Sequence, residues 1–177
     1  MKSDIIRIDN QGVGFDEALE QTEKVAAFRG LSHKETLQLT LCTEEMLSMA
    51  RIVTGELTAS FWLESEGKTF ELHLNTKTTM DKDKRYQLLS AATSRKNEAA
   101  NSFLGKLRDK FEEAMTAEAD HVYYELPAEI AADIPNYHPD DTEWDHYERS
   151  VLRRVADDVK IAIRGGVVDM TVVKSFA

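Results

Sequence analysis

Apolar side chains recur along the chain with two different periods, and the period predicts which segments are strands and which are helices. Alternating apolar and polar residues are typical of a half-buried strand, whereas recurrence every three or four residues is typical of a helix with one buried face. In chain order the pattern predicts a strand at 5–8, helices at 16–29 and 32–54, a hairpin at 57–65 and 68–76, helices at 82–92, 99–115 and 142–158, and a second hairpin at 159–164 and 167–176.

Local signals mark the ends of several of these elements. Gly30 follows the last apolar position of the first long helix and is expected to end it. Ser32 and Glu35 form a capping box, in which each side chain accepts a hydrogen bond from the other residue's backbone amide. Gly67 and the pair Gly165-Gly166 supply the tight turns of the two hairpins.

This order of elements predicts one α+β domain that spans all 177 residues. We expect a two-layer sandwich, with a mixed, mostly antiparallel sheet of about five strands and helices packed on one face. Residues 82–141 would form a helical insert in this domain. Residues 117–141 hold all three prolines and are the least regular part, although 121–126 fits a short strand.

Composition narrows the class of partner. The chain has 22 Lys+Arg and 32 Asp+Glu, and its net charge of -10 disfavours a nucleic acid, whose binding depends on basic side chains. Cys42 is the only cysteine, which excludes an internal disulfide and favours a reducing compartment; we expect it to be a small buried residue. The chain contains no run of about 18 consecutive apolar residues, the length needed to span a bilayer. We therefore expect a cytoplasmic protein that binds neither nucleic acid nor membrane.

Two stretches, LTLCTEEMLSMARIVTGE at 39–56 and SVLRRVADDVKIAIRGGVVDMTVVKSF at 150–176, resemble a known superfamily. They are similar to the Bergerat-fold (GHKL, histidine-kinase-like) ATPases, in particular the anti-sigma-factor serine-kinase branch. The likeness covers about two thirds of the chain at the level of element order, and its specific motifs cover far less. The resemblance implies a homodimer that holds a sigma factor and is released by an antagonist protein, and a site for ATP and magnesium.

The first box of that family is a Glu that acts as general base, followed one turn later by an Asn that binds magnesium. Taking Glu45 as the base places Met49 at the Asn position, whereas taking Glu44 places Ser48 there. We prefer Glu45 because its apolar neighbours then face the core. Neither register supplies an Asn, and the Met thioether is a poor ligand for magnesium. Both glutamates are also explained as solvated carboxylates on a helix.

The second box is Asp-x-Gly-x-Gly after the first hairpin, where the Asp binds the adenine amino group. Asn75 or Thr76 takes the Asp place here, and no glycine follows in NTKTTMD to let backbone approach a ligand. The third box, Gly-x-Gly-Leu, falls on YERSVL at 147–152, which also has no glycine. The three altered boxes indicate that binding of ATP and magnesium is weakened, altered or lost.

Three further stretches have alternative explanations. Arg95 and Lys96 lie where the family keeps a lid over the phosphates, and they could bind an anion or belong to a solvated helix face. The stretch DNQGVGFD at 9–16 has nearly the letters of the adenine box, but it precedes the Glu-bearing helix and is explained as a turn. The acidic and histidine residues of 138–146 favour a helix cap over a metal site.

We therefore expect a regulatory protein of this branch that acts mainly by binding other proteins. An active ATP-dependent serine kinase, with Glu45 as its base and Arg95 or Lys96 steadying the phosphates, is the alternative. A further alternative is an unrelated α+β interaction module. A fold in which the two hairpins did not share a sheet with the first strand would favour that last possibility.

Overall fold

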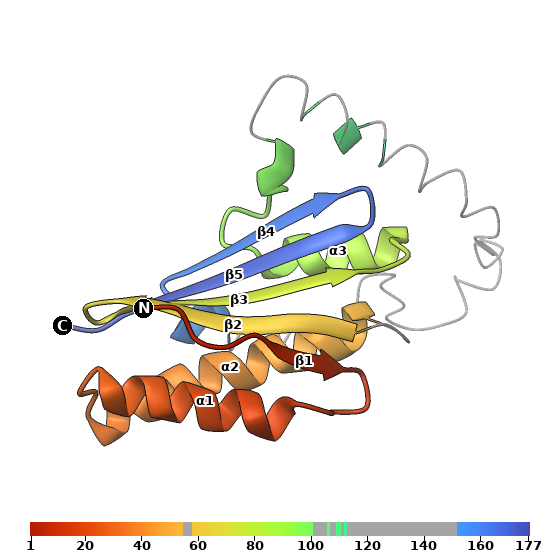
Figure 1. Cartoon of the computed structure of the whole chain (residues 1–177). Helices are drawn as coiled ribbons and strands as arrows, with labels where there is room; N and C mark the ends of the chain where they lie inside the picture. The colour runs from red at the N-terminus through yellow and green to blue at the C-terminus, as the bar shows by residue number, and fades with distance from the viewer. Residues whose placement is uncertain (55–57, 101–105, 107–108, 111, 113–151) are drawn as a thin grey trace, which may run out of the picture.

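Five strands form a single sheet, and helices cover one of its faces (Figure 1). The computed structural model describes residues 1–54, 58–100, 106, 109–110, 112 and 152–177. Its elements in chain order are β1 (Ile6–Asp9), α1 (Phe15–Phe28), α2 (His33–Thr54), β2 (Thr58–Glu66), β3 (Thr69–Lys77), α3 (Lys82–Ala91), the 3-10 helix η1 (Glu98–Ala100), β4 (Asp158–Arg164) and β5 (Val167–Ser175).

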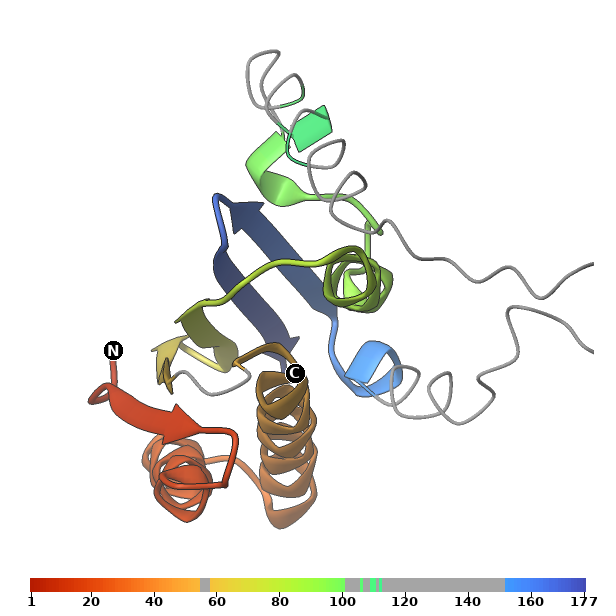
Figure 2. The same cartoon turned by 90° about the vertical axis from the view of Figure 1, so that its right-hand side faces the viewer.

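The strand order across the sheet is β1-β2-β3-β5-β4, and every pair of neighbours is antiparallel. The described sheet is thus purely antiparallel, where the sequence predicted a mixed and mostly antiparallel one. Figure 2 shows α1, α2 and α3 on the same side of this sheet, whereas η1 lies beside the edge strand β4. The predicted α+β sandwich with helices on one face is confirmed, and β1 shares one sheet with both hairpins.

The core lies between the sheet and the helices. Inward-facing, mostly apolar residues alternate with mostly polar outward-facing ones, which is why the strands show period two. The predicted apolar positions of the first hairpin are all buried in this core, where they pack with α1 and α2: Phe61, Leu63, Phe70, Leu72 and Leu74. The first hairpin turns at Gly67 and Lys68, and the second at Gly165 and Gly166, whose φ angles of 56° and 78° suit a two-residue turn.

The stretch DNQGVGFD is the turn that leads from β1 into α1. The Asp9 carboxylate accepts hydrogen bonds from the amides of Gln11 (2.9 Å) and Val13 (3.0 Å). Gly14, the residue before α1, has a φ of 78°, and a Cβ atom there would lie 2.2 Å from the Arg7 carbonyl oxygen. Backbone redirection therefore explains this glycine, as the turn interpretation predicted.

The other helices follow the prediction with shifted ends. The capping box before α2 is confirmed: the Ser32 amide donates to the Glu35 carboxylate at 2.6 Å, and the Glu35 amide donates to the Ser32 hydroxyl at 3.3 Å. The predicted helix at 99–115 begins with η1, and its few other described residues are helical. None of the described helices combines the length and apolar character needed to cross a membrane.

The last predicted helix, at 142–158, is described at 152–158, where it is helical at 152–155 and ends three residues earlier than predicted. The reason is pairing with β5, because the Asp157 amide donates to the Val173 carbonyl and Asp158 already belongs to β4. The predicted strand at 121–126 and the acidic stretch at 138–146 lie outside the described residues.

Candidate functional site

The Glu44 and Glu45 registers on α2 differ in how far their side chains are buried. Glu44 and Ser48 are exposed, whereas Glu45 and Met49 are half-buried one turn apart, on the same side of the helix. Met46 and Ala50, the apolar neighbours of the Glu45 register, are in the core at 0% and 1% exposure, and the first of them is among its largest side chains. The packing on which the preference for Glu45 was based is therefore present.

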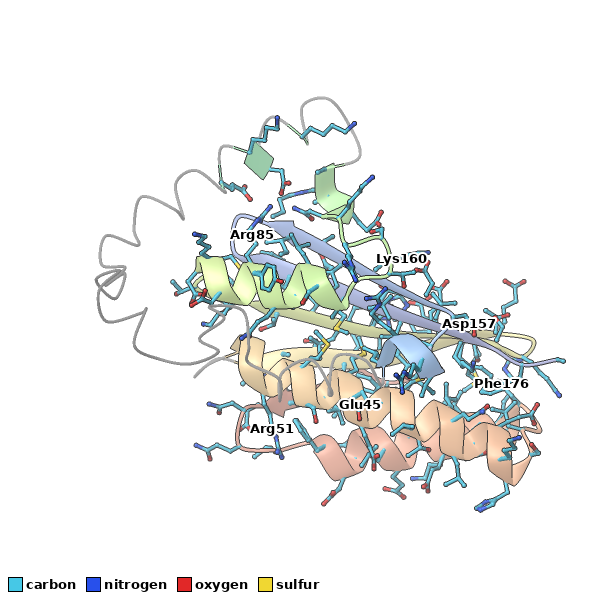
Figure 3. All side chains as sticks on the ribbon, turned by 180° about the vertical axis from the view of Figure 1, so that it is seen from behind. Glu45, Arg51, Arg85, Asp157, Lys160 and Phe176 are labelled. Atoms are coloured by element: carbon cyan, nitrogen blue, oxygen red, sulfur yellow. The ribbon has the colours of Figure 1, made fainter. Side chains whose placement is uncertain are left out.

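Glu45 lies where α2 faces the helical turn at 152–155 (Figure 3). One turn earlier on the helix, Cys42 is fully buried, as expected, and burial raises the pKa of its thiol to about 12. The charges of Lys174, Asp157 and Glu45 also act on this thiol, Lys174 lowering its pKa and the two carboxylates raising it. A thiol with such a pKa stays protonated at neutral pH. Cys42 therefore belongs to the hydrophobic core and does not act as a nucleophile.

The two candidates for the adenine contact point in opposite directions because they are consecutive residues of β3. The Thr76 side chain is buried on the helix-covered side, and its hydroxyl donates to the Thr58 carbonyl at 3.2 Å. Asn75 lies on the opposite face of the sheet, where its amide donates to the Asp169 carboxylate at 2.5 Å. Only Thr76 therefore shares a side of the sheet with Glu45 and Met49.

The chain after β3 approaches another backbone closely, but the glycine that permits this lies elsewhere in the sequence. The Thr78 amide donates to the Gly166 carbonyl at 2.8 Å, and a Cβ atom on Gly166 would lie 2.7 Å from the Thr78 carbonyl oxygen. The backbone at the second box is thus held by the turn between β4 and β5. Nothing in the local sequence of residues 75–81 indicates this contact.

Arg95 and Lys96 are exposed on a turn that follows α3, and Arg95 has a left-handed φ of 53°. Hydrogen bonds from Thr93 and Asn97 fix this turn along β4. α2 packs against β1, β2, β3 and β5, whereas β4 is the strand at the edge of the sheet. Arg95 and Lys96 therefore do not extend the half-buried surface formed by Glu45 and Met49.

The third box falls on residues 147–152, of which only Leu152 is described, and it is buried in the core. The candidate residues thus divide among three places: the helix-covered side of the sheet (Glu45, Met49, Thr76), its open face (Asn75) and its β4 edge (Arg95, Lys96). The first place brings together a carboxylate, a thioether and a hydroxyl that is already donating to a carbonyl.

The structure also shows a buried polar cluster that sequence reasoning missed. Arg85 of α3 is 7% exposed, and its guanidinium donates to the Asp109 carboxylate. The amide of Asn97, 5% exposed, donates to the same carboxylate oxygen. In the sequence, this cluster is indicated only by a basic residue, Arg85, at a position that the helical pattern of α3 places in the core. That position does not identify Asp109 as the partner.

The described parts of the chain contain no group of three His, Cys, Asp or Glu side chains close enough to hold a metal ion. Comparison of the sequence with known protein families finds no match, and comparison with curated proteins finds no similar protein.

Proposed function

We propose that this protein is a cytoplasmic regulator resembling the anti-sigma-factor serine kinases, and that it acts mainly by binding other proteins, with ATP binding weakened, altered or lost. The observation that carries the proposal is the division of the candidate nucleotide-binding residues among three separate places. Supporting it, β1 and both hairpins share one sheet, as the resemblance implies and as an unrelated module would not require.

Phosphoryl transfer depends on positioning and on electrostatic stabilisation, so a base, a magnesium ligand and phosphate-binding cations must surround one substrate. Glu45 is half-buried beside Met49, which offers magnesium only a thioether. Asn75 is bonded to Asp169 on the far face of the sheet. A regulator that holds a partner needs none of these groups to converge.

Calorimetric titration with ATP and with ADP, each with and without magnesium, tests the loss of nucleotide binding. We expect no saturable binding tighter than about 1 mM under any of the four conditions. Tight, magnesium-dependent binding of ATP would overturn the proposal. The variant Met49→Asn, which places an amide at the magnesium position, should not by itself create such binding, because the adenine and phosphate contacts would still be missing.

The active kinase is the second candidate, and the half-buried position of Glu45 favours it. In that case Glu45→Gln abolishes transfer of labelled phosphate to a purified antagonist protein, while the exposed neighbour Glu44→Gln leaves it unchanged. Under our proposal the wild-type protein transfers no phosphate.

The partners implied by the resemblance are a sigma factor and its antagonist, together with a second copy of the chain. Interferometry with purified candidates should show a complex that forms equally well with and without ATP.

A further inference from the structure

β4 is a seven-residue strand at the edge of the sheet, where backbone groups face away from β5. In an antiparallel strand, alternate residues direct both their N–H and C=O groups to the same side. Val159 and Ile163 direct theirs outward, as their bonding partners show, and Ile161 midway between them does so by the same alternation. An edge of this kind is a template for another strand unless something covers it.

Residues 93–97, here called the guard segment, cover this edge at two points. Thr93 exchanges two hydrogen bonds with Val159: its amide donates to the carbonyl at 2.9 Å, and its hydroxyl accepts from the amide at 2.8 Å. The Asn97 side chain does the same with Ile163, donating at 2.9 Å and accepting at 2.8 Å. Between these points, no described hydrogen bond joins the guard segment to Ile161.

One of the two points is itself held by the buried polar cluster. The Asn97 amide and the Arg85 guanidinium both donate to the Asp109 carboxylate, so Asp109 fixes the side chain that covers Ile163. The guard is therefore attached at two residues, through the backbone amide and hydroxyl of Thr93 and through the side chain of Asn97.

The sequence of β4, DVKIAIR, is complementary to itself about Ile161. In an antiparallel pair of two β4 strands centred on this residue, Asp158 lies opposite Arg164 of the second copy, and the reverse pair forms by symmetry. Val159 then faces Ile163 on the inner side, and Lys160 faces Ala162 on the outer side. Asp158 is half-buried and Arg164 is exposed on the open face, so both are within reach of a second copy.

We propose that β4 is a self-association surface, on which a second copy of this chain adds its own β4 in antiparallel register about Ile161 when the guard segment is released. The result is a continuous sheet across two copies. The occupant is a second copy because the charges at the two ends of β4 are opposite and equidistant from its centre. This inference goes beyond the proposed function and needs neither a nucleotide nor another partner protein.

Analytical ultracentrifugation of the guard variant Thr93→Val/Asn97→Ala tests the proposal, with circular dichroism to confirm that it is folded. We expect one association step beyond the state of the wild-type protein. Adding Arg164→Asp to this variant should weaken that step by roughly tenfold or more, because two symmetric attractions become repulsions. Adding Asp158→Arg as well should restore it. Lys77→Asp, the same charge change on the outer side of β3, is the matched control and should have little effect.

Cross-linking gives a second measurement should the guard variant fail to fold. In the otherwise wild-type chain, whose guard segment would be released only transiently, Lys160→Cys with Ala162→Cys places cysteines opposite each other across the proposed pair, and mild oxidation should trap those openings as covalent dimers. Lys160→Cys alone faces an alanine and should not. A folded guard variant with no added association, association that ignores the charge swap, or equal cross-linking of both cysteine variants would overturn the proposal.

Discussion

Among the described residues, His73, on the open face of the sheet, is a histidine whose surroundings shift its pKa. Its ring stacks on Trp62 with 5.0 Å between centroids, its Nδ1 lies 3.2 Å from the Thr171 hydroxyl, and its Nε2 lies 3.4 Å from a Glu71 carboxylate oxygen without hydrogen-bond geometry. Burial lowers its pKa below the ordinary value of 6.5, although the charges of Glu64, Glu71 and Asp169 act to raise it.

The sign of the resulting pH effect follows from proton binding. Because the folded state holds this proton less readily than the unfolded state, neutral His73 contributes stability above pH 6.5 that is lost as the pH falls below that value. We expect the free energy of unfolding in urea to fall between pH 7.5 and 5.5, and His73→Gln to remove that part of the slope. An NMR titration giving a folded-state pKa at or above 6.5 would contradict this.

At the scale of single residues, apolar burial was predictable, whereas hydrogen-bond partners on distant elements were not. Helical periodicity correctly placed Met46 in the core, and strand alternation explains why Thr76 is buried, which was not predicted. The pairing of Asn75 with Asp169 joins residues on β3 and β5, and that of Arg85 with Asp109 joins α3 to a later helical residue. Periodicity describes one element at a time, so it holds no information on contacts between elements distant in the chain.

Among the elements, the turn into α1 gives the sharpest prediction for a backbone position. Gly14 has a left-handed φ and no room for a Cβ atom, whereas Gly30 has a similar φ of 72° and nothing within 4 Å of a Cβ atom. We expect Gly14→Ala to cost about 3 kcal/mol and Gly30→Ala about 1 kcal/mol, because only the first adds a clash with backbone to the conformational strain. Urea denaturation of both variants measures the difference, and equal losses would refute the steric argument.

The capping box makes a separate prediction for the start of α2. Ser32→Ala removes the hydroxyl that accepts from the Glu35 amide and should lower the free energy of unfolding by about 1 kcal/mol. Ser32→Asp keeps an acceptor at the cap and should recover most of the loss. Thermal or urea unfolding of the two variants checks this, and an alanine variant as stable as the aspartate variant would show that the cap contributes nothing.

Element type was predictable because period and turn chemistry agree, while element ends depended on tertiary contacts. The turn at Gly165 and Gly166 was evident in the sequence from the two adjacent glycines. In the structure both adopt positive φ. The end of the helical stretch before β4 was not, because the Asp157 amide pairs with Val173 of β5. Competition between helix and sheet at such a junction is decided by the neighbouring strand, which a local pattern does not include.

At the scale of the whole molecule, the sheet and its helix-covered face were predictable from element order, since tight turns pair β2 with β3 and β4 with β5 and the helices must bury their apolar faces against the sheet. The candidate site was less so. Sequence reasoning treated Glu45, Asn75 and Arg95 as one constellation because they lie in the corresponding order along the chain. The strand order shows why the constellation divides: alternation sends Asn75 to the open face, and the guard segment holds Arg95 at the β4 edge.

The stability of the whole fold toward acid depends on carboxylates that accept hydrogen bonds in the folded state. Carboxylates with a lowered pKa include Glu35, Glu64 and Asp157. Hydrogen bonds from Ser32 lower the first, and those from Lys2 and Trp62 lower the second. Burial would raise the pKa of Asp157, but hydrogen bonds from Lys174 at 3.0 Å and the Ser175 amide at 2.7 Å outweigh it.

Each of these carboxylates binds protons less readily in the folded state than in the unfolded state. Their contribution is therefore present above the ordinary values of 4.5 for Glu and 3.8 for Asp, and it is lost as the pH falls through the lower folded-state values. We expect the free energy of unfolding to decline below about pH 4.5, in a step separate from that of His73. The triple variant Glu35→Gln/Glu64→Gln/Asp157→Asn should be less stable at pH 7 and show a shallower decline. Glu44→Gln, an exposed carboxylate on α2, is the control and should keep the wild-type slope, whereas a triple variant with that same slope would show that acid acts on other groups.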